Sequence, residues 1–389
     1  MLPQIMNDCI KYLEENNFIM KNPTEKSIEL RNIAVEYASQ LVNRKEKIAA
    51  IVLTGSSVGG YSGEGSDIDL DVLVNGKTKP IIKKIYKKIP IDLQYKSYEE
   101  WKDDCKNNCE ATRYLTHTVP IIDNSGEFQK LQKQLLSEYY SAETMKAHYN
   151  NISKIVIERS EAGVYDAENG DLISSAIKIE SALYEAISLL IYRYKGFTAT
   201  SLILSELDKI SKLLNHPEWF AKMIEYMRFN ISAEIAEEYL KDYGEIYIRM
   251  RELISENPNI PKKIRRRNLG YFSAGNLLEE LCSETDYIQT CDKIRRALAK
   301  NKNYDAGLNF WFGIHFNFFM FSPFFYLKNV NKDASVKEIT SKTFQTLYGY
   351  WDNDIKKRWA KIYGSNFLTK ELLVNMSNLS KEILPYCIC

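Results

Sequence analysis

The fold is decided by the stretch Ile51-Val-Leu-Thr-Gly55-Ser56-Ser57-Val-Gly59-Gly60-Tyr-Ser-Gly63-Glu-Gly65-Ser66-Asp67-Ile-Asp69-Leu-Asp71-Val-Leu-Val74. Its pattern predicts a buried strand, a turn rich in glycine and serine, and a second strand with acids at alternate positions. Because side chains alternate across a strand, Asp67 and Asp69 lie on the same face. The opposite face carries apolar side chains that we expect in the core: Ile68, Leu70 and Val72.

Two features of this stretch together indicate chemistry on phosphate groups. Paired carboxylates on one strand face form a site for a hard divalent cation such as Mg2+. The preceding turn offers backbone N–H groups and hydroxyls that suit a phosphate. Acids at 67, 69 and 71 on one face would repel each other without a cation, so we expect Asp71 to be solvent-facing or salt-bridged rather than a ligand. The stretch therefore predicts phosphoryl or nucleotidyl transfer.

The neighbouring sequence predicts a small α/β domain around this stretch. Apolar residues at helical spacing predict helices over 4–20 and 26–45, and Thr24 is a suitable N-cap for the second helix. Pro90-Ile91-Asp92-Leu93-Gln94-Tyr95 predicts a third strand with a single acid between apolar residues. Residues Val119 to Gly126 predict a further strand that ends in a turn.

A basic segment separates the second strand from the third. Residues Lys77 to Lys88 have paired lysines between apolar pairs, a spacing that predicts an amphipathic helix with a solvated basic face. A nucleic-acid contact on that face is the alternative interpretation.

The rest of the chain has helical spacing and almost no strand pattern. We therefore expect an α+β protein, with a small mixed-sheet domain over 1–145 and a larger all-helical domain over 146–389. The only dense basic run, Ile260 to Leu269, indicates a further division near 255–270. The helices that the spacing predicts in the second domain cover residues 174–194, 201–214, 217–229, 233–252, 273–281 and 286–299.

The composition is that of an ordinary soluble globular protein. Lysine plus arginine total 52 and aspartate plus glutamate 51, which argues against a protein that coats nucleic acid through its overall charge. Seven cysteines, an odd number, indicate free thiols in a reducing compartment. The first twenty residues lack the uninterrupted apolar core of a signal peptide, so we expect a cytoplasmic location.

One uncharged stretch, Gly307 to Leu327, is long enough to cross a bilayer. However, it contains Asn309, His315 and Pro323, and it is aromatic rather than aliphatic. A buried helix, or the wall of an aromatic pocket, is the favoured interpretation, and we expect no membrane partner. Its aromatic cluster, Phe310, Trp311, Phe312, Phe316 and Phe318, can stack a base or sugar, but core packing is the commoner outcome.

The arrangement resembles the polymerase-beta-type nucleotidyltransferase superfamily. The signature is a Gly-Ser pair after an apolar strand, then acid–apolar–acid–apolar, with a third acid on a later strand. Here Gly55-Ser56 is the pair, ten residues separate Ser56 from Asp67, and Asp67-Ile68-Asp69-Leu70 is followed later by Asp92. This resemblance implies two bound Mg2+ ions, with Mn2+ as an alternative, and a nucleoside triphosphate as co-substrate.

The resemblance also implies roles for individual residues. Asp67 and Asp69 would bridge both metal ions, and Asp92 would complete the second metal site and take a proton from the attacking hydroxyl. Gly55 and Ser56 would hold the terminal phosphates. Ser66 would cap the turn or add a phosphate contact.

A weaker likeness extends into the helical part. Ala186 to Leu214 is similar to the helix–turn–helix in the C-terminal domain of antibiotic nucleotidyltransferases, which modify aminoglycosides or lincosamides. That family often has a lysine after this turn to hold the triphosphate, where this chain has Thr200, Ser201 and Leu202. Lys178, or else Lys195, would take that role here. On the same apolar helix, Glu180 and Glu185 can meet a substrate amine or act as a base, although a salt bridge is commoner.

The leading hypothesis is transfer of a nucleoside monophosphate, AMP from ATP, onto a hydroxyl of a small molecule with release of pyrophosphate. An aminoglycoside-like antibiotic is the first acceptor class to consider. One alternative is a macromolecular acceptor, either a tRNA end or a protein side chain as in toxin-like relatives. A second alternative is a non-catalytic nucleotide-binding protein, against which the intact Asp67, Asp69 and Asp92 argue.

Overall fold

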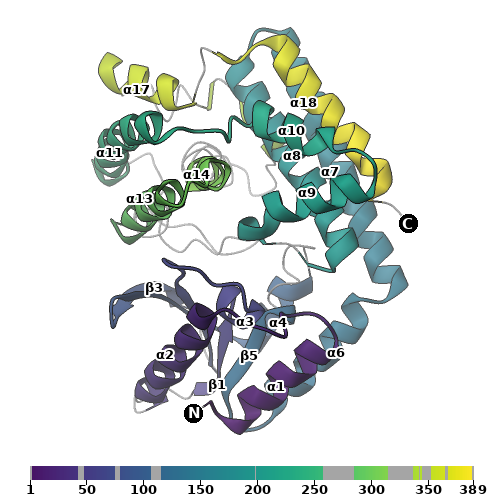
Figure 1. The fold of residues 1–389 in the computed structure, drawn as a ribbon, viewed down its shortest axis with the longest axis vertical. Helices are drawn as coiled ribbons and strands as arrows, with labels where there is room; N and C mark the ends of the chain where they lie inside the picture. Colours follow the sequence, from purple (N-terminus) through teal and green to yellow (C-terminus); the bar gives the residue numbers. More distant parts are fainter. Residues whose placement is uncertain are drawn as a thin grey trace. The chain divides into compact units, whose positions relative to one another are not determined.

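The computed structural model describes residues 2–42, 48–74, 79–106, 115–197, 199–256, 284–313, 336–340, 342–343, 352–363 and 367–387. They form two compact units (Figure 1). One unit is built from the chain up to His148 together with the segment Lys195–Ala199, and the other from Tyr149–Tyr194 and most residues from Thr200 onward. A mixed sheet followed by a mostly helical region confirms the predicted fold class, whereas the domain limits 1–145 and 146–389 stay a prediction.

The first unit holds a five-stranded sheet in the order β3-β4-β2-β1-β5. Strands β2 and β4 pair in parallel, and the other neighbours are antiparallel. The strands are β1 (Ile48–Thr54), β2 (Ile68–Val74), β3 (Lys79–Tyr86), β4 (Ile89–Lys96) and β5 (Thr118–Asp123). The helices of this unit are α1 (Gln4–Glu15), α2 (Glu25–Val42), α3 (Ser56–Gly59), α4 (Tyr98–Lys106) and α6 (Glu127–Tyr139).

The core of this unit lies where the alternation predicted it. Ile68, Leu70 and Val72 are at most 1% exposed, as expected for the apolar face of β2. Helix α2 packs on β1, and α1 packs on β5. The predicted N-cap of α2 is also present, because the Thr24 hydroxyl accepts a hydrogen bond from the Ser27 amide at 3.1 Å.

The helix predicted over residues 77–88 is wrong, because residues 79–86 form the edge strand β3. Strands β3 and β4 make a hairpin in which Tyr86 pairs with Ile89, so only Lys87 and Lys88 form the loop. Both loop residues have positive φ, 48° and 65°, as a type I′ turn requires. Such turns usually contain Asn-Gly. Because this loop is Lys-Lys, the sequence did not predict a hairpin here. Lys83 and Lys84 therefore lie on opposite faces of a strand, and Lys87 and Lys88 form the loop, instead of lining one helix face.

The second unit is helical and contains most of the predicted helices. Residues 273–281 and 314–327 lie outside the described residues. Helices at the long 142–168 segment and near the C-terminus were not predicted. Among the described residues, no helix has the length and apolar character to span a membrane. The elements are α7 (Ala142–Glu168), α8 (Leu172–Lys195), η2 (Thr200–Leu202), α9 (Ile203–Leu213), α10 (Glu218–Tyr226), α11 (Ala233–Glu256), α13 (Glu284–Ala299), α14 (Asn303–Phe310), η4 (Val336–Glu338), α17 (Asn353–Tyr363), α18 (Lys370–Ile383) and η6 (Leu384–Tyr386).

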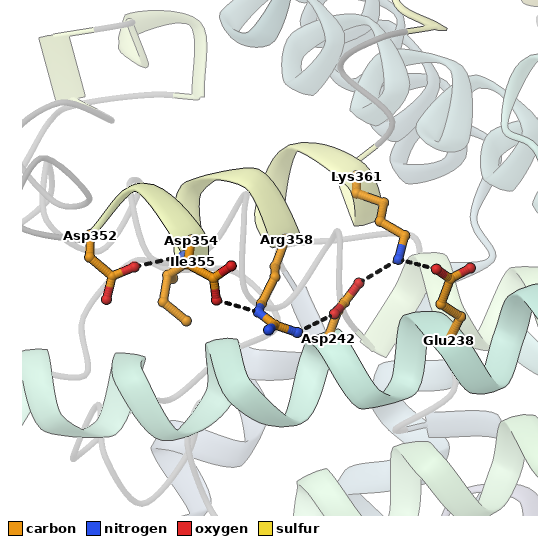
Figure 2. A network of polar contacts seen from close by, with 7 residues as sticks. All are labelled: Glu238, Asp242, Asp352, Asp354, Ile355, Arg358 and Lys361. Carbon is orange, nitrogen blue, oxygen red and sulfur yellow. Dashed lines mark hydrogen bonds and ion pairs between the residues drawn. The ribbon is translucent and has the colours of Figure 1, made fainter.

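Within this unit an ionic network joins α17 to α11 (Figure 2). Asp242 of α11 is 5% exposed and accepts hydrogen bonds from Arg358 at 2.7 Å and from Lys361 at 2.8 Å. Lys361 also donates to Glu238 at 2.5 Å, one turn before Asp242 on α11. The two cations at successive turns of α17 therefore set its register against α11.

Candidate active site

The register of the sheet places one polar residue from each strand in a single row. Lys83 on β3 pairs with Asp92 on β4, and Asp92 pairs with Asp69 on β2. Asp69 pairs with Thr54 on β1, and Thr54 pairs with Thr118 on β5. Residues paired across neighbouring strands lie on the same face of a sheet, about 5 Å apart. We call these five residues the polar row.

The polar row brings together two of the three acids singled out by the sequence. Asp69 and Asp92 are direct cross-strand neighbours, and both are half-buried. Asp67, also half-buried, directly precedes the first residue of β2, where alternation puts it on the face of Asp69. At the far end of the row, the Thr118 hydroxyl donates to the Thr54 hydroxyl at 3.1 Å.

Gly55 lets the turn after β1 approach the acids closely. Its φ is +87°, and a Cβ at this position would lie 2.5 Å from Oδ2 of Asp69. A larger residue would therefore be strained and would collide with the acid. The Gly55 amide donates to the carbonyl of His117 at 2.9 Å, which fixes the turn to the start of β5.

The turn leads directly into the short helix α3, which begins at Ser56. The first N–H groups of a helix have no partner within it, which applies to the amides of Ser56 and Ser57 in α3. The Ser56 and Ser62 hydroxyls lie 3.0 Å apart, and the Ser62 amide donates to the Ser27 hydroxyl at 2.9 Å. We call residues 55–60 the phosphate turn, after the role that the sequence predicts for Gly55 and Ser56.

Ser66 closes a separate turn just before the acids. Its hydroxyl accepts the Gly63 amide at 3.0 Å, and its own amide donates to the Gly63 carbonyl at 3.1 Å. Of the two roles proposed for Ser66, the structure therefore shows the capping one. A phosphate contact by Ser66 stays a prediction.

Helix α2 holds the phosphate turn from behind, through a residue that the sequence did not reveal. Arg31 is 4% exposed, and its guanidinium donates to the carbonyls of Ser57 and Val58, each at 2.8 Å. Burial lowers the pKa of Arg31, although an arginine stays charged in proteins. Hydrogen bonds from a charged group contribute about 1.5–3 kcal/mol, so Arg31 is a strong restraint on the turn.

The segment before α2 holds the far end of the same turn. The Met20 amide donates to Gly59 at 3.0 Å, and the Thr24 amide donates to Gly60 at 2.9 Å. The Thr24 hydroxyl lies 2.7 Å from the Ser62 carbonyl. No repeating pattern in the sequence indicates such bonds to backbone carbonyls.

Two lysines lie on the face of the sheet that carries the acids. Lys83 forms an ion pair with Oδ2 of Asp92 at 3.6 Å, with side-chain exposures of 17% and 23%. Lys96 of β4 forms an ion pair with Asp71 at 3.1 Å, and there the exposures are only 2% and 5%. Of the two environments predicted for Asp71, the salt bridge is thereby confirmed, and solvent exposure is wrong. Lys83 was missed because its segment was predicted to be helical.

The segment Lys195–Ala199 belongs to the first unit although it begins at the last residue of α8. The Phe197 ring meets the His117 ring edge-on at a centroid distance of 4.4 Å, and Tyr61 packs on His117 as well. The Tyr140 hydroxyl donates to the Gly196 carbonyl at 2.6 Å. His117 is fully buried beneath the rings of Phe197 and Tyr61.

Two candidates on α8 are engaged within the helical unit. Lys178 is 3% exposed and forms an ion pair with Asp166 of α7, so its triphosphate role stays a prediction. Burial raises the pKa of Asp166, which the lysine partly opposes. Glu185 forms the commoner salt bridge, at 2.5 Å from Arg159.

Glu180 lies deeper in the same unit, next to the aromatic cluster. Its carboxylate accepts the Trp311 indole N–H at 3.0 Å, and burial raises the pKa of this carboxyl. Trp311 stacks on Tyr184 at 5.1 Å, and both Phe310 and Trp311 are buried. Core packing is therefore confirmed for these two rings, while residues 316 and 318 lie outside the described residues.

A group of potential metal ligands in the helical unit is already bonded internally. His216, Glu218 and Glu382 bring their ligand atoms within 4.8 Å of one another. However, His216 contacts Glu218 through Nδ1 at 2.8 Å and the Tyr386 hydroxyl through Nε2 at 2.7 Å. Both ring nitrogens are thus occupied, which fits a structural histidine.

The donors at the polar row fit a hard divalent cation. They are carboxylate oxygens from adjacent strands, and oxygen is the ligand that Mg2+ and Mn2+ take in such sites. The contact between Gly55 and the Asp69 carboxylate puts the phosphate turn directly beside these donors. The residues predicted to bind the metal and those predicted to bind phosphate therefore lie side by side in the first unit.

Comparison with a known protein family supports this arrangement. Residues 35–115 match the family model of the nucleotidyltransferase domain, a span that includes the phosphate turn and all three acids. A nucleotidyltransferase-like protein of known structure from Exiguobacterium sibiricum is similar with 12% identity and a TM-score of 0.32, covering 71% of this chain and 92% of that one. No curated protein matches the chain. The chain thus contains a nucleotidyltransferase domain of the polymerase-beta-like superfamily and is a nucleotidyltransferase.

Proposed function

We propose that this nucleotidyltransferase is metal-dependent and moves AMP from ATP onto a hydroxyl of a small molecule. The observation that carries the proposal is the register of Asp69 with Asp92, directly beside the phosphate turn. Carboxylates that bind a divalent cation and a turn that binds phosphates are the two elements that such a transfer needs.

Each group in the site has a distinct task in this proposal. Asp67, Asp69 and Asp92 hold Mg2+, for which Mn2+ is an alternative. When bound, the metal supplies Lewis-acid polarisation of the triphosphate and of the attacking hydroxyl. Gly55 and Ser56 receive the terminal phosphates through backbone N–H groups and a hydroxyl. Arg31 holds the next two residues of the turn by donating to the carbonyls of Ser57 and Val58.

The transfer of AMP can be written as one bond formed and one bond broken, with the proton and the leaving group received by the residues named above. The acceptor oxygen forms a bond to the α-phosphorus, and the bond from that phosphorus to the bridging oxygen of the β-phosphate breaks. Pyrophosphate leaves toward the phosphate turn. The proton of the acceptor hydroxyl passes to the Asp92 carboxylate, which lies at the end of the acid pair.

For the acceptor, we propose an aminoglycoside-like antibiotic as the first class to test. The support is the likeness of Ala186–Leu214 to antibiotic nucleotidyltransferases, and this stretch forms a helix–turn–helix built from α8, η2 and α9. The buried free thiols of Cys9, Cys291 and Cys387 suit a reducing compartment, and we place the protein in the cytoplasm.

The direct test is pyrophosphate release from ATP and Mg2+ in the presence of an aminoglycoside panel, with mass spectrometry of the acceptor. We expect one acceptor to gain a single AMP, and D69N to release pyrophosphate far more slowly than the wild type. Label moving from ATP to tRNA or protein would overturn the small-molecule acceptor. Full activity of Asp67→Ala or D69N would overturn the transfer mechanism itself.

A further inference from the structure

We infer that Lys83 is a built-in counter-ion that occupies the cation position beside Asp92 until a divalent metal displaces it. This inference rests on the proposed function, because it assumes that Asp92 is a metal ligand. It adds a residue that controls how tightly, and in what order, the metal and the nucleotide bind.

The backbone register itself places this lysine. Lys83 is the direct partner of Asp92 in the β3–β4 hairpin, and Asp92 is the direct partner of Asp69. Three consecutive positions of the polar row therefore read cation, anion, anion. The ammonium lies 3.6 Å from Oδ2 of Asp92, on the same face of the sheet as both carboxylates.

A lysine at this position balances part of the negative charge of the acids through an ion pair that can exchange with another cation. Like-charged carboxylates on adjacent strands repel each other, and a nearby ammonium relieves that repulsion. The side chain is 17% exposed and sits on the edge strand, so its flexible stem can move toward solvent. An ion pair of this kind is weak enough to exchange.

A divalent cation that binds Asp92 must therefore compete with this ammonium. Metal binding on its own is weakened, because it breaks the pair and brings two like charges together. A bound triphosphate reverses this balance, since its negative charges attract both the metal and the displaced ammonium. We thus expect metal and nucleotide to bind with positive cooperativity that depends on Lys83.

The neighbouring Lys84 provides a matched control. It lies on the same strand but on the opposite face, it pairs with Ile91, and it is exposed. Lys83→Met and Lys84→Met remove the same charge from the protein as a whole. Only the first removes a charge from the polar row.

The experiment measures Mn2+ binding to the full chain by electron paramagnetic resonance, with and without a non-hydrolysable ATP analogue. Without nucleotide, K83M should bind Mn2+ roughly five- to tenfold more tightly than the wild type, as expected from loss of a partly buried competing ion pair. K84M should match the wild type. The nucleotide should improve Mn2+ affinity less in K83M than in the wild type. In EDTA, K83M should also have a lower Tm, which Mg2+ restores.

Unchanged or weaker Mn2+ binding by K83M would overturn the inference. Circular dichroism checks that the variant is folded, and Lys83→Gln serves if the methionine variant does not fold. D69N separates this inference from the proposed function. If D69N binds Mn2+ as the wild type does, the metal site itself is wrong. If D69N loses binding while K83M equals the wild type, only the role of Lys83 is wrong.

Discussion

Two lysine–aspartate pairs lie on one face of the same sheet, yet their surroundings differ. The outer pair, Lys83–Asp92, is separated by 3.6 Å and is partly exposed. The inner pair, Lys96–Asp71, is separated by 3.1 Å and is almost fully buried. Asp71 is only two residues beyond Asp69 on β2. The same two residue types thus form an exchangeable ion pair at Asp92 and a fixed, structural ion pair at Asp71.

The difference follows from the dielectric environment. At 4 Å, two unit charges attract with about 1 kcal/mol in water and about 4 kcal/mol at the effective dielectric near a protein surface. The outer pair is accessible to water and salt, whereas the inner pair has lost its hydration and has to keep its partner. The inner lysine also balances the charge of Asp71, the third acid on this face, so that in our proposal Asp67 and Asp69 join Asp92 at the metal.

The largest expected effect concerns Asp69, which is next to Asp92 in the polar row and two residues before the buried Asp71. Asp69→Asn should lower the transfer rate by roughly 1,000-fold, because metal-assisted charge stabilisation contributes several kcal/mol and each 1.36 kcal/mol is tenfold. Its Tm should stay close to that of the wild type, because Asp69 is only half-buried. Rates from pyrophosphate release and Tm from circular dichroism check both parts. A large loss of Tm with little loss of rate would reverse the comparison.

The second prediction tests the inner pair. Lys96→Met should lower the free energy of unfolding by about 3–5 kcal/mol, because it removes the ammonium that balances the charge of the buried Asp71 carboxylate. The double variant D71L/K96M should recover most of that loss, since an apolar pair can replace a buried ion pair. Urea unfolding measures both. Equal losses in K96M and K83M would show that the two pairs do not differ.

The third prediction tests whether nucleotide binding by the phosphate turn can be weakened without a change in metal binding by the acids. Arg31→Met removes two hydrogen bonds to Ser57 and Val58, which should raise the KM for ATP by roughly tenfold or more. Mn2+ affinity without nucleotide should not change, because Arg31 contacts the turn and not the acids. Arg31→Lys should recover part of the effect. A fall in Mn2+ affinity equal to the rise in KM would mean that the turn and acids act as one unit.

The smallest effect concerns a buried acid whose hydrogen-bond donor is an indole and not a lysine. Glu180 accepts the Trp311 N–H, and burial raises the pKa of this carboxyl above its ordinary value of 4.5. The protonated form therefore stabilises the fold below pH 4.5, and that stabilisation is lost as pH rises through the raised pKa. Glu180→Gln should show no such loss, so its stability relative to the wild type should improve between about pH 4 and pH 7. Urea midpoints that move in parallel at both pH values would contradict this.

The local part of the site could be predicted from the sequence, and its supports could not. The strand, turn and strand from Ile51 to Val74 could be predicted because apolar runs, alternating acids and glycines determine the backbone conformation locally. Arg31 was invisible because its partners are backbone carbonyls, which any residue provides. Lys83 was misplaced because the hairpin turn uses two lysines with positive φ instead of Asn-Gly. Lys96 was missed because pairing with Asp71 depends on the order of strands.

The segment Lys195–Ala199 has a practical consequence for anyone who wishes to dissect the protein. Cutting the gene after His148 would leave out Phe197, which covers the buried His117, and Gly196, which accepts the Tyr140 hydroxyl. The shortened protein would expose an imidazole and a phenol next to the strand end that anchors Gly55. The catalytic unit is therefore best studied in one piece with the helix that delivers this segment.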